Sequence, residues 1–165
     1  MFVLTIDQRA SRSNPDRVPE LLVDLASRLD PACLVLPFVR TVGDEVQGVL
    51  ADPIAVVDAI LHVVRAGGWS IGVGAGRATL ASASEGGAPA STGDAFVHAR
   101  AAVERAKGRT VANALAVNAD SAVAAARAEA VLQLLASVLR RRSAKQWRAL
   151  DLLARPGATG VEVAA

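Results

Sequence analysis

The chain has 165 residues, of which 52% are hydrophobic and 21% charged, so it has the composition of one globular domain with a small appendage and not that of a disordered chain. Eighteen basic and sixteen acidic residues leave a formal net charge of +2, which by itself does not indicate a nucleic-acid partner. Aromatic residues make up 3%, which argues against stacking of single-stranded nucleic acid, and the single cysteine, Cys33, excludes an internal disulfide and a cysteine-based zinc site.

The chain shows no sign of a targeting or membrane-spanning segment. No apolar run approaches the ~18 residues that indicate a transmembrane helix. The N-terminal sequence "MFVLTIDQR" lacks the basic start and the small-residue cleavage site of a signal peptide. We therefore expect a cytoplasmic protein with no membrane partner.

The first part of the chain predicts a strand, a helix and a hairpin. Residues 2–6 form an apolar, β-branched run that is typical of a strand covered on both faces. Asp16 precedes a run with helical spacing of its apolar residues, and is expected to cap that helix. The runs 33–39 and 45–50 predict two strands, which a tight two-residue turn at Gly43-Asp44 would join.

The middle of the chain continues this alternation. Asp52-Pro53 predicts the start of a helix that ends at Gly67-Gly68. Residues 69–76 predict a strand whose glycines lie on one face, which a helix or a flat ligand could approach closely, and close packing of a helix is the favoured interpretation. Ser91-x-x-Asp94 is expected to open a third helix, which ends at Gly108. A short strand follows at 113–118.

The resulting order is β-α-β-β-α-β-α-β. Because the hairpin requires antiparallel neighbours, a doubly wound parallel sheet does not fit. The order favours an α+β domain over residues 1–118, with a ferredoxin-like or palm-type antiparallel sheet and its helices on one face, followed by a helical C-terminal segment.

The C-terminal part predicts helices only. Apolar residues at Val131, Leu134, Leu135 and Val138 indicate a long amphipathic helix, assigned as a connecting or dimerisation helix over 119–142. Ser143-x-x-Gln146 and Thr159-x-x-Glu162 are two capping boxes. They predict that 143–165 begin a helix-turn-helix whose continuation is absent from this chain, so DNA is expected as a partner of the full-length protein only.

Three acidic residues are candidate metal ligands. Asp7 ends the first strand and Asp44 lies at the tip of the hairpin, so a ferredoxin-like sheet would bring the two carboxylates together. Such a pair takes up a proton or binds a cation, and Mg²⁺ is commonly held by one or two carboxylates together with substrate phosphates. Glu45 is a third candidate, although strand alternation could point it to the other face.

Basic residues near this pair are candidate contacts for phosphate. Arg9 and Arg12 follow Asp7 in a polar loop, Arg40 flanks the hairpin, and Arg100 lies on the third helix. A second basic cluster spans the junction between the last two helices and could contact DNA phosphates or simply complement a helix C-terminus. This cluster consists of Arg140, Arg141, Arg142, Lys145 and Arg148.

The segments "TIDQRASR", "FVRTVGDEVQGVL", "WSIGVGAG" and "GDAFVHAR" resemble, in order and spacing, those of SatD-like proteins. This is a bacterial family with an N-terminal acid motif, a Gly-Asp-Glu-x-Gln segment and often a C-terminal helix-turn-helix. The resemblance covers about residues 1–108. It implies a transcriptional regulator that binds DNA.

More remotely, the pattern is similar to class III nucleotide cyclases and related palm domains. That resemblance implies that Asp7 and Asp44 bind Mg²⁺ or Mn²⁺ over a nucleoside triphosphate. It also places Arg40 where a cyclase has a base-reading Lys and Arg100 where it has a transition-state Arg. Cyclases carry an Asn four residues before that Arg, whereas this chain has Phe96.

These observations lead to one main hypothesis and two alternatives. The main hypothesis is a cytoplasmic regulator whose N-terminal domain binds a nucleotide and a divalent metal without cyclising the nucleotide, and whose long helix transmits that state or forms a homodimer. One alternative is an active cyclase or other nucleotidyl transferase. The other is a structural or protein-binding module with a degenerate site. No catalytic residue can be assigned from the sequence.

Overall fold

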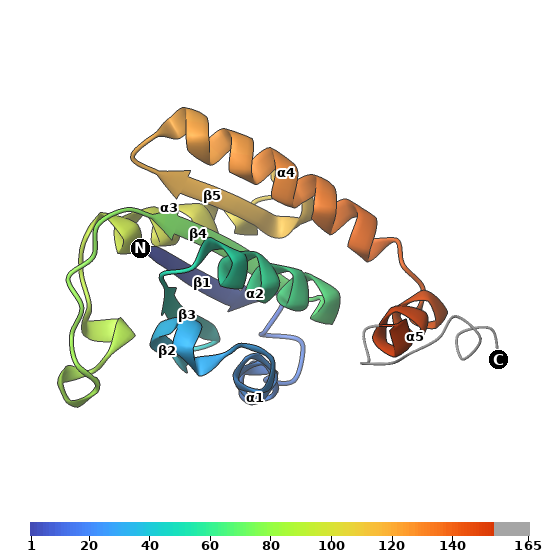
Figure 1. Ribbon diagram of the computed structural model, residues 1–165, viewed down its shortest axis with the longest axis horizontal. Helices are drawn as coiled ribbons and strands as arrows, with labels where there is room; N and C mark the ends of the chain where they lie inside the picture. The colour runs from blue at the N-terminus through green and yellow to red at the C-terminus, as the bar shows by residue number, and fades with distance from the viewer. Residues whose placement is uncertain (154–165) are drawn as a thin grey trace.

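A computed structural model describes residues 1–153 (Figure 1). The five strands are β1 (Phe2–Gln8), β2 (Leu34–Arg40), β3 (Glu45–Leu50), β4 (Trp69–Ala75) and β5 (Leu115–Ala119). The α-helices are α1 (Val18–Arg28), α2 (Pro53–Ala66), α3 (Asp94–Lys107), α4 (Ala122–Arg140) and α5 (Ala144–Leu153). Four short 3₁₀ helices lie at Pro31–Cys33, Ala83–Glu85, Ala88–Ala90 and Ala112–Ala114.

The strands form one mixed sheet in the order β2-β3-β1-β4-β5. The pairs β1/β3, β1/β4 and β2/β3 are antiparallel, as the ferredoxin-like order requires. The pair β4/β5 is parallel, so the sheet is not wholly antiparallel. The α+β fold with a helical C-terminal segment is confirmed, and β5 is a parallel addition to the ferredoxin-like unit.

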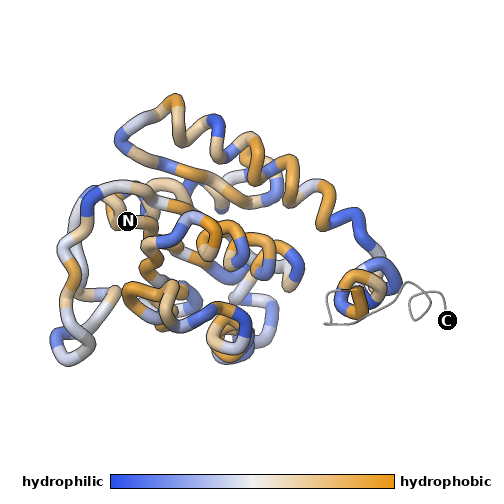
Figure 2. Tube along the Cα trace, in the orientation of Figure 1, coloured by the Kyte–Doolittle hydropathy of each residue, from blue (hydrophilic) through white to orange (hydrophobic). Residues whose placement is uncertain are grey.

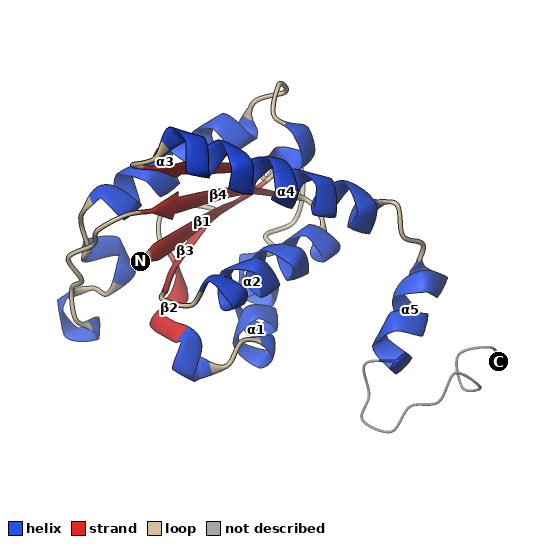
Figure 3. Ribbon diagram, turned by 45° about the horizontal axis from the view of Figure 1, so that its top comes forward, coloured by secondary structure: helices blue, strands red, loops and turns tan. Residues whose placement is uncertain are grey.

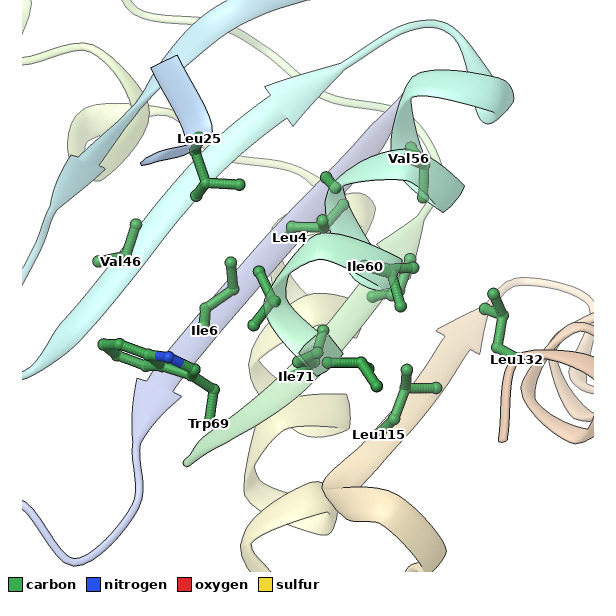
Figure 4. Close-up of a cluster of buried hydrophobic side chains, with 14 of the residues drawn as sticks. Leu4, Ile6, Leu25, Val46, Val56, Ile60, Trp69, Ile71, Leu115 and Leu132 are labelled. Carbon is green, nitrogen blue, oxygen red and sulfur yellow. The ribbon is translucent and has the colours of Figure 1, made fainter. Parts of the chain in front are cut away.

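Helices cover both faces of the sheet, so the expectation of helices on one face was wrong for α3 (Figure 3). Helices α1, α2 and α4 share a core with Leu4 and Ile6 of β1, as Figure 4 shows around Ile60 and Trp69. Helix α3 packs on the opposite face, against Val3. The physical reason is the parallel β4/β5 pair, because a crossover between parallel neighbours must pass over one face of the sheet.

Two glycines of β4 allow α3 to lie directly on the sheet. A Cβ atom at Gly72 would lie 2.2 Å from the backbone nitrogen of Val103, and one at Gly74 would lie 2.0 Å from the carbonyl oxygen of Ala95. Both contacts are with helix backbone, which cannot move aside as a side chain could. The expected close packing of a helix on this glycine face is confirmed.

Helix boundaries follow local chemistry in α2 but not in α3. The Asp52 carboxylate accepts hydrogen bonds from the amides of Ile54 and Ala55, and Pro53 occupies the first turn, as predicted. Ser91 does not cap α3, because its hydroxyl donates to the carbonyl of Gly87 and accepts from the amide of Ala81. Ser91 therefore closes the loop before α3.

Helix α4 covers the outer edge of β5 (Figure 1). The side chain of Gln133 donates to the carbonyl of Leu115, and the carboxylate of Glu129 accepts from the amide of Val117. These contacts satisfy backbone groups that an exposed edge strand would leave open for pairing with another chain.

The apolar side chains that predicted α4 point away from the sheet. Its buried residues are Ala125, Leu132 and Ala136, whereas an exposed stripe consists of Val131, Leu134, Leu135 and Val138. Figure 2 shows hydrophobic residues along much of this helix. Such a stripe is what a dimerisation helix needs, so dimerisation through α4 stays a prediction.

Helix α4 is also the one helix of the described residues with the length and mean hydropathy of a membrane span. Its side chains Glu129 and Gln133 form hydrogen bonds with the backbone of β5, so α4 packs against the sheet of this domain.

Helix α5 begins as the sequence predicts. The Ser143 hydroxyl accepts from the amide of Gln146, and the Gln146 side chain accepts from the amide of Ser143, which completes the capping box. The second predicted box, Thr159-x-x-Glu162, lies outside the described residues.

Candidate functional site

Three polar side chains lie in a row across one end of the sheet, on the face that α3 covers. The register pairs Asp7 at the end of β1 with Glu45 at the start of β3 and with Ser70 in β4. Directly paired residues of antiparallel strands point to the same face. Behind this row, the buried Gln47 side chain donates to the Thr5 hydroxyl.

Glu45 lies on the same face as Asp7, and both of its oxygens are engaged. Its side chain is 5% exposed and lies 3.0 Å from a guanidinium nitrogen of Arg100. Its other oxygen accepts a 2.7 Å hydrogen bond from the hydroxyl of Thr41. The possibility that strand alternation turns Glu45 to the other face does not hold, since Glu45 is the registered partner of Asp7.

Asp7 is held by a lysine. The ammonium of Lys107, the last residue of α3, lies 2.8 Å from a carboxylate oxygen of Asp7. Burial raises the pKa of Asp7, and the bond to Lys107 opposes this. The nearby carboxylates of Asp44 and Glu45 add to the increase, so the pKa of Asp7 lies above its ordinary value. The charge on Asp7 is therefore destabilised in spite of its ion pair.

Asp44 lies beside Asp7 at the tip of the hairpin. Four residues separate the two strands, and not two, with Gly43 at φ +63°. The carbonyl of Asp44 accepts a 3.3 Å hydrogen bond from the amide of Gln8, which ties the turn to the end of β1. Within the described residues, the Asp44 carboxylate makes no hydrogen bond or ion pair.

A cleft of about 560 Å³ opens over these carboxylates, and we call it the Asp7 cleft. It is lined by Asp7, Gln8, Asp44, Ser70 and Lys107 together with the loop from Arg9 to Ser13. Arg9 and Arg12 are exposed on this loop, and neither side chain forms a hydrogen bond or ion pair with any part of the chain that the structure describes. The cleft therefore combines carboxylates with uncommitted guanidinium groups.

Two other predicted arginines are occupied elsewhere. Arg40 forms an ion pair with Asp16 and lines a neighbouring cleft of about 310 Å³, which Arg12 and Asp44 also line. Arg100 is bound to Glu45 and does not line the Asp7 cleft. The structure thus brings Arg9, Arg12 and Arg40 near Asp44, and it attaches Arg100 to the buried end of the row.

The carboxylates do not form a preassembled metal cage. No group of three or more acidic, histidine or cysteine side chains in residues 1–153 is arranged to hold an ion. Asp7 and Asp44 supply two carboxylates, which matches the small number that Mg²⁺ takes from protein when phosphates and water complete its shell. The arrangement suits a cation that arrives with a phosphate ligand.

The C-terminal basic cluster is divided between packed and exposed side chains. Arg140 donates to the carbonyl of Asn113, and Arg142 stacks on Trp147 at 5.2 Å from the ring centre. Arg141, Lys145 and Arg148 are exposed and carry no side-chain ion pair within the described part of the chain.

Lys107 is the site residue that the sequence-based reasoning missed. Its position at a helix end gave no reason to place it beside Asp7, since that contact joins residues 100 positions apart. One signal was present: Lys107 and Lys145 are the only lysines among eighteen basic residues. A lysine presents a compact ammonium on a flexible stem, which differs from the planar guanidinium of the arginines around it.

Comparison of the chain with protein-family models, with curated proteins and with solved structures finds no match.

Proposed function

We propose that the α+β domain binds a nucleoside phosphate together with Mg²⁺ or Mn²⁺ in the Asp7 cleft, and that it does so without catalysis as the ligand-sensing part of a cytoplasmic, SatD-like DNA-binding regulator. The observation that carries the proposal is that one cleft is lined by Asp7 and Asp44 and also by Arg9, Arg12 and Lys107. Opposite charges that line one cleft complement a ligand that itself combines a cation with phosphate.

The loop arginines support the phosphate part of the proposal. Arg9 and Arg12 have no partner among the described side chains, so a ligand phosphate would not have to break an existing ion pair to reach them. Guanidinium groups bind phosphate oxygens through two parallel hydrogen bonds, which gives both strength and orientation.

The acidic residues support the metal part. Burial, with the carboxylates of Asp44 and Glu45 nearby, destabilises the charged form of Asp7. A divalent cation between Asp7 and Asp44 would relieve that repulsion, because it supplies two positive charges to carboxylates that repel each other. When bound, the ion would also neutralise the phosphates of the ligand.

Two features favour binding without turnover. In the resemblance to cyclases, Arg100 stands where the transition-state arginine is found, yet here Arg100 pairs with the buried carboxylate of Glu45. Phe96 stands where a cyclase has an amide side chain.

Isothermal calorimetry with ATP, GTP, CTP and UTP, each with Mg²⁺, tests the proposal. We expect one nucleotide to bind wild type, and Asp44→Ala to weaken that binding at least tenfold. Asp58→Ala is the control, since Asp58 is an exposed acid of α2 outside the cleft. Absence of binding to wild type, or equal binding to Asp44→Ala, would refute the proposal.

The DNA part of the proposal rests on the exposed cations at the start of α5. Arg141, Lys145 and Arg148 are free to contact backbone phosphates. Lys145→Ala with Arg148→Ala should weaken binding to duplex DNA of any sequence, and should reduce the slope of log affinity against log salt concentration by about two phosphate contacts. Anisotropy titrations at several salt concentrations measure both. An unchanged slope would remove α5 from the DNA contact.

A further inference from the structure

Lys107 lies directly against the carboxylate of Asp7, one of the two candidate metal ligands that line the cleft. Its ammonium lies 2.8 Å from an Asp7 oxygen and 3.0 Å from an oxygen of Glu104, one turn earlier in α3. A lysine ammonium is positively charged at neutral pH, and here it lies between two carboxylates.

A divalent cation and this ammonium cannot both sit against Asp7 without strong repulsion. Mg²⁺ binds carboxylate oxygens at about 2.0–2.1 Å and demands near-ideal octahedral geometry, so it would need space that the ammonium fills. Lys107 can leave, because its side chain is 34% exposed and ends a helix, and because Glu104 stays within its reach as a second partner.

Lys107 shares the cleft with the two loop arginines. It lines the Asp7 cleft together with Arg9 and Arg12, so a phosphate bound in this cleft would lie among all three cations. An ammonium on a four-carbon stem can follow a phosphate group over a range of positions, which the planar fork of an arginine cannot do as readily.

We propose that Lys107 is an internal counter-ion of Asp7 that a divalent cation replaces on binding, and that the released ammonium then contacts the phosphate of the incoming ligand. The proposal rests on the function proposed above, and it adds a reason for the site to select a metal–phosphate complex over the free metal ion. A free metal ion must displace Lys107 with no compensation, whereas a metal–phosphate complex supplies a new partner for it. The site therefore discriminates against free Mg²⁺ and couples metal binding to phosphate binding.

The test measures Mn²⁺ affinity by electron paramagnetic resonance, with Mn²⁺ alone and with Mn²⁺ plus inorganic triphosphate. Lys107→Gln should bind Mn²⁺ alone about tenfold more tightly than wild type, because its competitor is gone, and should bind Mn²⁺ with triphosphate more weakly. Lys107→Arg keeps the charge and should retain weak binding of Mn²⁺ alone. Lys145→Gln is the matched control, since it alters the other lysine, outside the cleft.

Three outcomes decide between the proposals. Tighter binding of Mn²⁺ alone in Lys107→Gln but not in Lys107→Arg supports the exchange, and a merely structural role of the lysine would not produce it. If wild type binds Mn²⁺ with triphosphate and Lys107→Gln leaves the affinity for Mn²⁺ alone unchanged, the exchange is refuted while the site stands. If wild type binds no Mn²⁺–triphosphate and Lys107→Gln binds no Mn²⁺, both proposals fail.

Discussion

At the scale of single residues, the Asp7 cleft contains a partly buried charge that lowers the stability of the unliganded protein and that a ligand could compensate. The charged form of Asp7 is disfavoured by burial and by two nearby carboxylates, and its one described ion pair does not reverse this. Functional sites commonly retain such unfavourable charges because a ligand later compensates them.

This leads to a prediction for the unliganded protein. A folded-state pKa above the unfolded value means that Asp7 stabilises the fold fully only below its ordinary pKa, and that this contribution is lost as pH rises through the folded-state value. Asp7→Asn should therefore be more stable than wild type at pH 7, by about 0.5–1 kcal/mol. The difference should shrink as pH falls toward 4.

Urea unfolding of both proteins at several pH values measures this difference. Asp58→Asn is the control, because it removes an exposed acid of α2 and should show no such pH-dependent gain. If Asp7→Asn were less stable than wild type at pH 7, the ion pair with Lys107 would outweigh burial, and the charge on Asp7 would not be destabilised.

At the scale of elements, the packing of α3 on β4 positions Lys107 over Asp7. That packing depends on Gly72 and Gly74, where any side chain would collide with the helix backbone. The position of Lys107 is thus determined about one turn away, at Val103, and about three turns away, at Ala95, by glycines that carry no side chain.

Gly74→Ala should destabilise the protein by about 3 kcal/mol or more, because the added methyl group forces α3 away from the sheet. Gly43→Ala is the comparison: its Cβ would meet nothing within 4 Å, so only its positive φ of +63° opposes it. We expect a cost of about 1 kcal/mol for Gly43→Ala. Thermal unfolding measures which of the two variants loses more stability. Equal losses of stability would contradict the close packing of α3 on β4 as the cause.

At the scale of the whole molecule, α5 attaches to the domain through a small contact. The guanidinium of Arg65 in α2 binds both carboxylate oxygens of Asp151, at 2.7 and 2.6 Å, and lies 4.3 Å from the ring centre of Trp147. Arg142 stacks on the same ring, and α5 contributes no fully buried residue. Such a contact allows α5 to open without unfolding of the sheet.

Arg65→Ala should therefore release α5 while leaving the main unfolding transition almost unchanged. Loss of about 1 kcal/mol of docking energy corresponds to roughly fivefold faster tryptic cleavage within α5, at Lys145 or Arg148. Arg28→Ala is the control, since Arg28 lines the groove that Arg65 and Trp147 also line, without a described bond to α5. Equal cleavage rates in wild type and Arg65→Ala would show that Arg65 does not hold the helix.

What could be predicted from the sequence is mainly local. The helix start at Asp52-Pro53, the capping box at Ser143 and the order of helices and strands along the chain follow from local sequence patterns, and the structure has them. The face of Glu45 could not be predicted, because it depends on the register with β1. The contact between Lys107 and Asp7 depends on how α3 crosses the sheet.

Contacts outside the helix itself also explain α4 and Ser91. Periodicity identified α4 as amphipathic but not which face packs, and polar contacts of Glu129 and Gln133 with β5 turn the apolar stripe outward. Ser91 has the spacing of a cap, yet its hydroxyl bonds within the preceding loop. A contact between elements thus orients α4, whereas a contact within the loop takes Ser91 away from the helix start.

The central claim is that the Asp7 cleft binds metal and phosphate together. Thermal unfolding with Mg²⁺ alone, with nucleoside triphosphate alone and with both tests it most directly, because a ligand at 100 times its dissociation constant stabilises the folded state by about 2.7 kcal/mol. We predict a clear rise in melting temperature only with both together, and a clearly smaller rise in Asp44→Ala, whose binding is weakened. An unchanged melting temperature under every condition, or an equal rise in Asp44→Ala, would contradict the claim.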